Sequence, residues 1–175
     1  ATCFDKVWVC VSPNAEKKNQ MFTPEQKLLL VKTAVADLPN VCVVDGSDYA
    51  VSKATFPTYF LKRLSVASDT QMLLDLDLYG RHIAPALGAT VRFVGSEPTD
   101  ALTCRYNKLM QATLPDVRVM QRYEVDGEPV SASRVRMALV KNSLSAAAPL
   151  VPPTTLPYLI AHLATRALRT ELNTT

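Results

Sequence analysis

Short runs of continuously apolar residues alternate along this chain with longer segments of helical periodicity, and this alternation constrains the fold more than any other feature. A run that is apolar at every position and stops at a polar or glycine-containing break is typical of a strand buried on both faces. Two such strands are predicted, at Val7–Val11 and Val41–Val44, and two further strands, each with one arginine, are predicted at Val91–Val94 and Val117–Met120. Strands that alternate with helices predict right-handed β-α-β units, and therefore an α/β fold with a mostly parallel sheet and helices on both faces.

The segments between the strands indicate where helices begin and end. Thr23 and Gln26 are a cap residue and a capping-box residue, with proline at the first helical position between them. The helix that they begin is expected to run to about Asp37. Gly88 is the expected C-cap of a helix over residues 69–87. The other predicted helices cover residues 56–66, 103–112, 131–140 and 155–172.

Composition excludes several classes of protein. The 175 residues are 48% hydrophobic and 20% charged, which suits one globular domain with a sizeable core. The formal charge of +3 is far below the basic excess of a protein that wraps nucleic acid. No C-x-x-C pair occurs and the two histidines, His82 and His162, lie far apart, so neither a metal site nor a disulfide scaffold is indicated. The apolar runs near the start are too short for a signal or a membrane span, and we expect a protein of the reducing cytoplasm.

The segment Val130–Arg136 places two hydroxyls and an arginine on the first turn of a predicted helix. A helix start offers unpaired backbone N–H groups and the positive end of the macrodipole, so Ser131, Ser133 and Arg136 are candidates to hold a polyphosphate. The alternative is an ordinary N-cap, because Ser-x-Ser ahead of an apolar helical run also caps a helix. Taken alone, the pattern favours the cap, and its context favours the phosphate site.

That context is the set of polar breaks that follow the predicted strands. In parallel α/β sheets, ligands bind at the carboxyl ends of the strands. The breaks are residues 12–18, Gly46-Ser47, Gly95-Ser96-Glu97 and the turn leading to Ser131. We expect all four to face one edge, where lysines, glycines, hydroxyls and Arg136 together suit a nucleotide better than an apolar ligand.

Several phrases of the sequence fit one family when they are taken together. They are residues 22–25, 36–41, 54–60, 83–88, 92–98, 106–107 and 131–136. The chain resembles, nearly end to end, the C-terminal nucleotidyltransferase-like domain of citrate lyase ligase. It is more distantly similar to phosphopantetheine adenylyltransferase, whose Ile-Ser-Ser-Thr-x-x-Arg motif looks like Val130–Arg136. The resemblance implies a Rossmann-like nucleotidyltransferase fold with an ATP site, formed by residues 1–175 as one domain.

The resemblance also implies a reaction. Acetate attacks the α-phosphorus of ATP to give acetyl-adenylate and pyrophosphate, and the prosthetic-group thiol of the citrate lyase acyl carrier subunit then takes the acetyl group and releases AMP. Acetate is ionised at neutral pH, so the first step requires no general base. It requires that two anions meet and that the charge on the leaving pyrophosphate is neutralised. Mg²⁺ is expected to accompany the phosphates and to keep most of its waters.

Candidate site residues follow from the family match. Ser131, Ser133 and Arg136 are expected at the β- and γ-phosphates. Lys18, or else Lys17, is expected near the α-phosphate, where it resembles the strand-end lysine of phosphopantetheine adenylyltransferase. Lys18 and Arg136 are thus the expected catalytic residues. The alternative for the two lysines is solvated charge in a polar loop.

A second group of candidates lies farther along the chain. Gly95, Ser96 and Glu97 are expected to let the backbone approach the adenosine, although a glycine after a strand is commonly only a turn residue. Tyr106 and Asn107 are weaker candidates to line the acetate or thiol side. For Tyr106 the alternative is core packing on an amphipathic helix, and for His82 and His162 structural or surface roles are expected.

The chain departs from the family in one respect. The superfamily motif H-x-G-H, on the helix after the first strand, has no counterpart, and residues 1–6 look like the end of that helix. The missing strand is central in the family's sheet, so its absence is expected to leave backbone groups and apolar area exposed. Three explanations are open: a truncated product, a partner segment that supplies the strand, or a degenerate protein. The function alternatives are an adenylyltransferase for a phosphate monoester such as phosphopantetheine, and a non-catalytic nucleotide-binding remnant.

Overall fold

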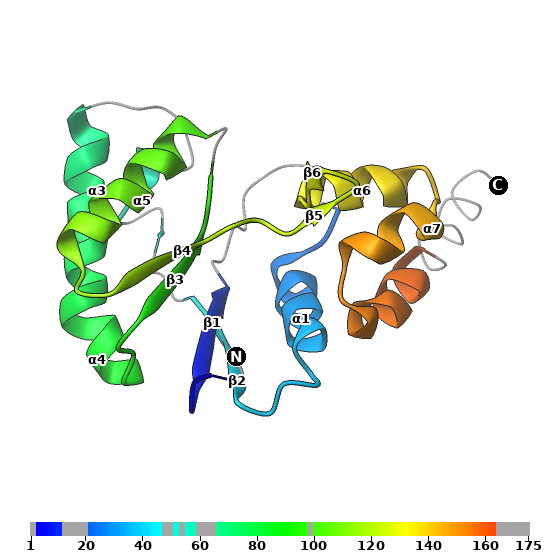
Figure 1. Cartoon of the computed structure of the whole chain (residues 1–175), viewed down its shortest axis with the longest axis horizontal. Helices are drawn as coiled ribbons and strands as arrows, with labels where there is room; N and C mark the ends of the chain where they lie inside the picture. The colour runs from blue at the N-terminus through cyan, green and yellow to red at the C-terminus, as the bar shows by residue number, and fades with distance from the viewer. Residues whose placement is uncertain are drawn as a thin grey trace. The chain divides into compact units, whose positions relative to one another are not determined.

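A computed structural model describes residues 3–11, 21–46, 51–52, 55–58, 66–97 and 100–163 of the chain (Figure 1). Contacts divide the chain into two compact units. Unit 1 is built from the described parts of residues 1–7, 15–43 and 123–175, and unit 2 from those of residues 8–14 and 44–122. Each unit has its own buried core.

Unit 2 is organised around a parallel strand pair. Strands β3 (Arg92–Gly95) and β4 (Val117–Met120) run side by side, with Arg92 opposite Val117 and Gly95 opposite Met120. Helices α3 (Val66–Leu78) and α5 (Ala101–Thr113) pack against each other beside this pair (Figure 1). Their contact encloses a core of Phe56, Met72, Leu76, Leu102, Tyr106 and Met110, against which Val94 and Val117 pack.

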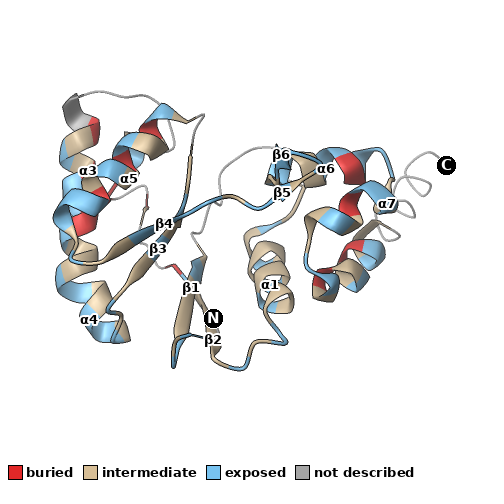
Figure 2. Ribbon diagram, in the orientation of Figure 1, coloured by how far each residue is buried: buried red, intermediate tan, exposed pale blue. Residues whose placement is uncertain are grey.

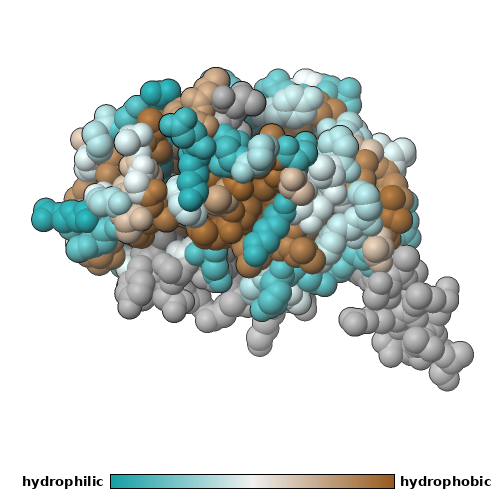
Figure 3. Space-filling model, turned by 90° about the horizontal axis from the view of Figure 1, so that it is seen from below, coloured by the Kyte–Doolittle hydropathy of each residue, from teal (hydrophilic) through white to brown (hydrophobic). Residues whose placement is uncertain are grey.

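The opposite face of the same strand pair carries apolar side chains that stay accessible. Phe93 and Met120 are 41% and 57% exposed, and they share a face because their register partners are Arg118 and Gly95. Figure 3 shows that apolar side chains gather on one face of the molecule as a whole. Only the face toward α3 and α5 is therefore buried within unit 2.

The long helical segment predicted at residues 69–87 is interrupted. It begins three residues earlier, with α3 at Val66, passes through a π-helical turn η1 (Tyr79–Ile83) and continues as α4 (Ala84–Leu87). Gly88 ends it in the left-handed conformation at φ 63°, which confirms the predicted C-cap. Helix α5 begins at Ala101, two residues before the predicted start, because Asp100 caps it by accepting a hydrogen bond from the Thr103 N–H at 3.1 Å.

The two N-terminal strands form a second pair, β1 (Val7–Val11) with β2 (Val41–Asp45). The Val7 N–H donates to the Asn40 carbonyl and the Gly46 N–H to the Val11 carbonyl, so both strands run in the same direction. All four predicted strands are thus confirmed in position. The single sheet is not observed: within the described residues the strands form two parallel pairs, with no ladder from β1 to β3.

Unit 1 is mainly helical. Helix α1 (Pro24–Ala34) begins with the predicted capping box, in which Thr23 and Gln26 each bond the other's backbone N–H. It ends three residues before the predicted Asp37, because a turn closed by the Ala36 N–H and the Thr33 carbonyl replaces the helical bonding.

The rest of unit 1 follows strand β4 in the sequence. The elements are the hairpin strands β5 (Glu124–Val125) and β6 (Glu128–Pro129), helices α6 (Ala132–Val140) and α7 (Leu144–Ala147), the 3-10 turns η2 (Ala148–Leu150) and η3 (Pro153–Thr155), and helical residues 156–163. Their core is Ala138, Leu139, Ala147 and Leu159 (Figure 2). The predicted helix at 155–172 is confirmed over residues 156–163, after Thr155 in η3, and that at 56–66 at residues 57, 58 and 66, with residue 56 outside a helix; residues 59–65 and 164–172 lie outside the described part.

Candidate functional site

The predicted phosphate-binding segment lies at the start of α6. Ser131 has extended backbone angles and precedes the first helical residue, and its hydroxyl oxygen accepts a hydrogen bond from the Arg134 N–H at 3.2 Å. The N-cap that the sequence offered as an alternative is therefore present. The first intrahelical bond joins the Val135 N–H to the Ser131 carbonyl. This leaves the N–H groups of Ala132 and Ser133 as the outward donors of the first turn.

Two side chains of that turn lie next to each other on the surface. The Arg136 guanidinium donates from Nη2 to the Ser133 hydroxyl oxygen at 3.0 Å, and both residues are exposed. A hydroxyl partner leaves the positive charge of Arg136 uncompensated in this contact. An exposed guanidinium, a hydroxyl and two outward N–H groups together form a donor set for an anion such as a phosphate.

The hairpin β5–β6 leads directly into this turn. Asp126 and Gly127 connect its strands with φ of 57° and 75°, the two left-handed angles of a type I′ turn. The Val130 N–H donates to the Tyr123 carbonyl at 2.8 Å and closes the hairpin one residue before Ser131. The start of α6 is therefore fixed to a hairpin rather than to a free loop.

In unit 2, three predicted residues lie together at the carboxyl end of β3. Gly95 ends the strand, and the Ser96 N–H continues the ladder by donating to the Met120 carbonyl at 2.8 Å. A Cβ atom at position 95 would lie more than 4 Å from every atom beyond the two neighbouring residues, so the space beside Gly95 is open. This openness fits the prediction that a ligand approaches the backbone here.

Two further residues hold this strand end. Asn107 donates its side-chain N–H to the Gly95 carbonyl at 3.0 Å, and Arg122 donates from Nε to the Ser96 carbonyl at 2.8 Å. Arg122 also forms an ion pair with Glu97. Asn107 was expected on the substrate side, and Arg122 was not among the predicted site residues. The signal for Arg122 was its place two residues beyond β4, whose last residue pairs with Gly95.

Tyr106 belongs to a buried polar cluster that the sequence analysis did not anticipate. Its side chain is 5% exposed, and its hydroxyl donates to the carboxylate of Asp75, which is 2% exposed. Asp75 also accepts from the Val51 N–H at 2.6 Å and from the Thr55 hydroxyl at 3.3 Å. Burial raises the pKa of Tyr106 above its ordinary value. These contacts favour the core-packing alternative for Tyr106; the predicted role beside the substrate stays a prediction.

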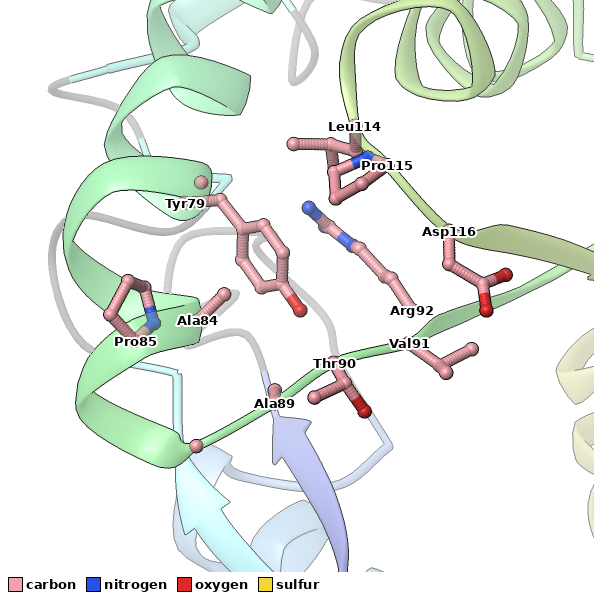
Figure 4. A pocket seen from close by; sticks show the side chains of 12 residues that line it. Tyr79, Ala84, Pro85, Ala89, Thr90, Val91, Arg92, Leu114, Pro115 and Asp116 are labelled. Carbon is pink, nitrogen blue, oxygen red and sulfur yellow. The ribbon is translucent and has the colours of Figure 1, made fainter.

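The pocket found in unit 2 lies at the other end of the strands. It has a volume of about 460 Å³ and lies between η1, α4 and the residues that precede β3 and β4 (Figure 4). The Arg92 guanidinium stacks over the Tyr79 ring at 4.0 Å from its centroid, and Ala84, Pro85 and Leu114 add apolar walls. Because Arg92 and Val117 are the first residues of their strands, this pocket opens at the amino ends, away from Gly95.

The other predicted site residues either lie outside the described residues or fall into two separate groups. Lys17 and Lys18 lie outside the described residues, and their roles stay predictions. Ser131, Ser133 and Arg136 belong to unit 1, and Gly95, Ser96 and Glu97 to unit 2. The structure brings each group together, and the convergence of the two groups stays a prediction.

The described part of the chain carries no sign of a metal centre or of a membrane span. No group of three or more His, Cys, Asp or Glu side chains gathers there that could hold a metal ion. None of the helices described is both long and apolar enough to cross a membrane. His82 is exposed, which fits a surface role, and His162 packs its ring 4.6 Å from that of Phe22, which fits a structural role.

Comparison with known proteins gives one consistent family. Residues 4–159 match the model for the citrate lyase ligase C-terminal domain. The chain is 42% identical over 153 residues to citrate (pro-3S)-lyase ligase of Escherichia coli, covering 82% of this chain and 44% of that protein. It is 40% identical over 147 residues to the ligase of the same name from Klebsiella pneumoniae, covering 79% and 43%. The chain therefore spans less than half the length of these relatives.

A shorter match points to a second family. The chain is 58% identical over 38 residues to phosphopantetheine adenylyltransferase of Leuconostoc citreum, covering 22% of this chain and 23% of that protein. No solved structure matches the chain.

Proposed function

This chain belongs to the citrate lyase ligase family, of which it matches the C-terminal domain, and we propose that it serves in the ATP-dependent acetylation of the citrate lyase acyl carrier protein. The match over residues 4–159 carries this proposal. Relatives named for a ligase that acts on citrate lyase support the ligase class and the carrier protein as substrate. The open, donor-rich start of α6 supports a site for a polyphosphate.

The proposed reaction has two steps. A carboxylate oxygen of acetate forms a bond to the α-phosphorus of ATP while the bond to the bridging oxygen breaks, and pyrophosphate leaves with the electron pair. The thiolate of the carrier's prosthetic group then bonds to the acetyl carbon of acetyl-adenylate, and AMP leaves. Both steps transfer a group between anions, so the principal task of the protein is to position the reactants and to neutralise charge.

The residues fit these tasks as follows. Ser133, Arg136 and the outward N–H groups of α6 would bind the β- and γ-phosphates and stabilise the leaving pyrophosphate. The oxygen of the Ser131 hydroxyl accepts the capping hydrogen bond, and its O–H can still donate a hydrogen bond to a phosphate oxygen. Lys18, or Lys17, would lie near the α-phosphate. Mg²⁺, bound mainly by the phosphates, would supply further neutralisation of their charge.

The carboxyl end of β3 would take the nucleoside. The open space beside Gly95 supports close approach of the adenosine to the backbone, and the contacts of Asn107 and Arg122 hold that backbone in place. Asn107 would then act on the nucleoside side by positioning Gly95, and a direct contact with acetate stays a prediction.

A second candidate function is transfer of AMP to a phosphate monoester such as phosphopantetheine. The 58% identity over 38 residues with phosphopantetheine adenylyltransferase favours it. The same donor set at α6 would serve this reaction, because pyrophosphate leaves ATP in both cases. The acceptor alone distinguishes the two.

Exchange of labelled pyrophosphate into ATP tests the proposal. It should be measured on this chain, and on the chain joined to a segment that carries an H-x-G-H strand and helix, with acetate, with phosphopantetheine and with neither. Exchange that requires acetate is the expected result. Exchange that requires phosphopantetheine would establish the adenylyltransferase instead, and ATP binding without exchange in either sample would indicate a non-catalytic remnant.

A further inference from the structure

Arg134 and Arg136 lie two residues apart at the start of α6, but their side chains have different partners. The Arg134 guanidinium donates from Nη1 to the Glu128 carbonyl at 2.7 Å and to the Pro129 carbonyl at 3.2 Å, and from Nη2 to the Val125 carbonyl at 3.4 Å. Its side chain is 23% exposed. Arg136 is exposed and contacts the Ser133 hydroxyl. The two arginines of this turn therefore have different tasks.

The carbonyls that Arg134 binds come from both strands of the hairpin. Val125 ends β5, and Glu128 and Pro129 form β6. A hairpin with strands of two residues each is only marginally stable by itself. One planar guanidinium that binds both strands fixes the hairpin to the helix that follows it, and the fork of N–H donors in arginine suits this arrangement better than a lysine ammonium.

The fixed hairpin in turn determines where the donor set of α6 points. The Val130 N–H is bound to the hairpin through the Tyr123 carbonyl, and the next residue, Ser131, caps the helix. The Ser131 hydroxyl accepts from the backbone N–H of Arg134 itself. Arg134 therefore contributes its backbone to the cap and its side chain to the hairpin, so this one residue links the hairpin to the first turn.

We propose that Arg134 is a positioning residue, which fixes the β5–β6 hairpin to the first turn of α6 and thereby aims Ser133 and Arg136 at the phosphates of a nucleoside triphosphate. This inference rests on the proposed function, because it assumes that α6 binds those phosphates. It assigns ligand contact to Arg136 and denies it to Arg134. Three backbone carbonyls already accept hydrogen bonds from the guanidinium of Arg134.

The ion pair of Arg134 offers a matched control. Its Nε lies 3.5 Å from the Glu128 carboxylate, whose side chain is 73% exposed. An exposed pair at this distance contributes little. Glu128→Gln removes this pair and keeps all three carbonyl contacts, whereas Arg134→Lys keeps the charge and loses the fork.

The test measures ATP affinity by calorimetry and hydrogen exchange of the amides at residues 124–130, on the full chain. Arg134→Lys is expected to bind ATP on the order of tenfold more weakly and to exchange these amides faster, while amides of residues 138–140 keep wild-type protection. Arg134→Gln, which keeps two donors without the charge, should change both quantities in the same directions. Arg136→Ala should weaken ATP binding with unchanged exchange, and Glu128→Gln should leave both within about twofold.

Three results would overturn the inference. Faster exchange in Arg134→Lys with wild-type ATP affinity would mean that the hairpin has no influence on binding. Weaker ATP binding with unchanged exchange would mean that Arg134 contacts the nucleotide directly. Failure of the wild-type chain to bind ATP would contradict the proposed function itself and remove the positioning role with it, and this outcome is recognised before any variant is compared.

Discussion

Two polar clusters, one in each unit, both contain hydroxyl groups but differ in where their hydrogen bonds go. In unit 2 the carboxylate of Asp75, 2% exposed, accepts from one backbone N–H and from the hydroxyls of Thr55 and Tyr106. In unit 1 the first turn of α6 exposes the hydroxyl of Ser133 and the guanidinium of Arg136 to solvent. The first cluster completes its hydrogen bonds inside the protein, and the second leaves donors directed outward.

The difference teaches where ligand binding is to be sought. A buried polar group that lacks a partner is costly, so a closed cluster stabilises a fold and has no donor left for a ligand. An exposed donor set contributes little to stability, because water satisfies it, and it can exchange water for phosphate. The Asp75 cluster should therefore affect unfolding, and the α6 cluster should affect nucleotide binding.

Asp75→Ala is expected to have the largest effect. It leaves the Val51 N–H and the Thr55 and Tyr106 hydroxyls without their buried acceptor, and should lower the free energy of unfolding by about 3–5 kcal/mol. Urea unfolding followed by circular dichroism measures it. The control is Asp77→Ala on the same helix, whose ion pair with Arg81 is exposed and whose loss should change stability by less than about 0.5 kcal/mol. Equal effects of the two substitutions would contradict the closed-cluster interpretation.

Arg136→Ala tests the other cluster. Loss of a charge-assisted phosphate contact should weaken ATP binding by about 1.5–3 kcal/mol, with little change in unfolding. Calorimetric titration with ATP measures the affinity. Arg118→Ala removes the same charge from an exposed pair with Asp116 in unit 2, and should leave the affinity unchanged. If Arg136→Ala bound ATP as the wild type does, Arg136 would not belong to the site.

Ser131 caps helix α6 and is also a predicted phosphate ligand, and substitutions can separate these two roles. Ser131→Ala removes the cap and should cost about 1 kcal/mol of stability. Ser131→Asp restores a good cap and places a negative charge at the helix start, so stability should recover while ATP binding weakens further. Urea unfolding measures the stability of the two variants, and calorimetric titration measures their affinity for ATP. Wild-type ATP affinity in Ser131→Asp would show that no phosphate lies near this residue.

Alkaline pH should produce the smallest and most gradual effect. Burial raises the pKa of Tyr106 in the folded protein, so above the ordinary value of about 10 the unfolded chain loses this proton while the folded chain retains it. The stabilisation that comes from keeping Tyr106 protonated is fully present below about pH 10, and it is lost progressively as the pH rises above this value. Urea unfolding between about pH 9 and pH 11 should show falling stability. Tyr106→Phe should flatten this slope only in part, because burial raises the pKa of Tyr79 as well.

The sequence by itself determined the features that depend on neighbouring residues. Short runs of β-forming apolar residues predicted all four strands: β1 and β2 are apolar through Val11 and Val44, whereas β3 and β4 each carry one arginine within the run. The capping box of Thr23 and Gln26, the left-handed Gly88 and the cap of Ser131 were also predictable, since each rests on bonds within one turn of chain. The candidate phosphate segment followed from the hydroxyls and arginine at the start of a predicted helix, and the family resemblance from matching phrases along the sequence.

Only the tertiary structure decided the partners of residues far apart in the chain. Asp75 meets Tyr106 across 31 positions, and Arg122 meets the Ser96 carbonyl across 26, because helix packing and strand register bring them together. Even Arg134, six residues from Glu128, required the hairpin to fold back before its guanidinium could reach three carbonyls. A local pattern specifies which donors a segment carries, whereas packing decides whether the protein or a ligand receives them.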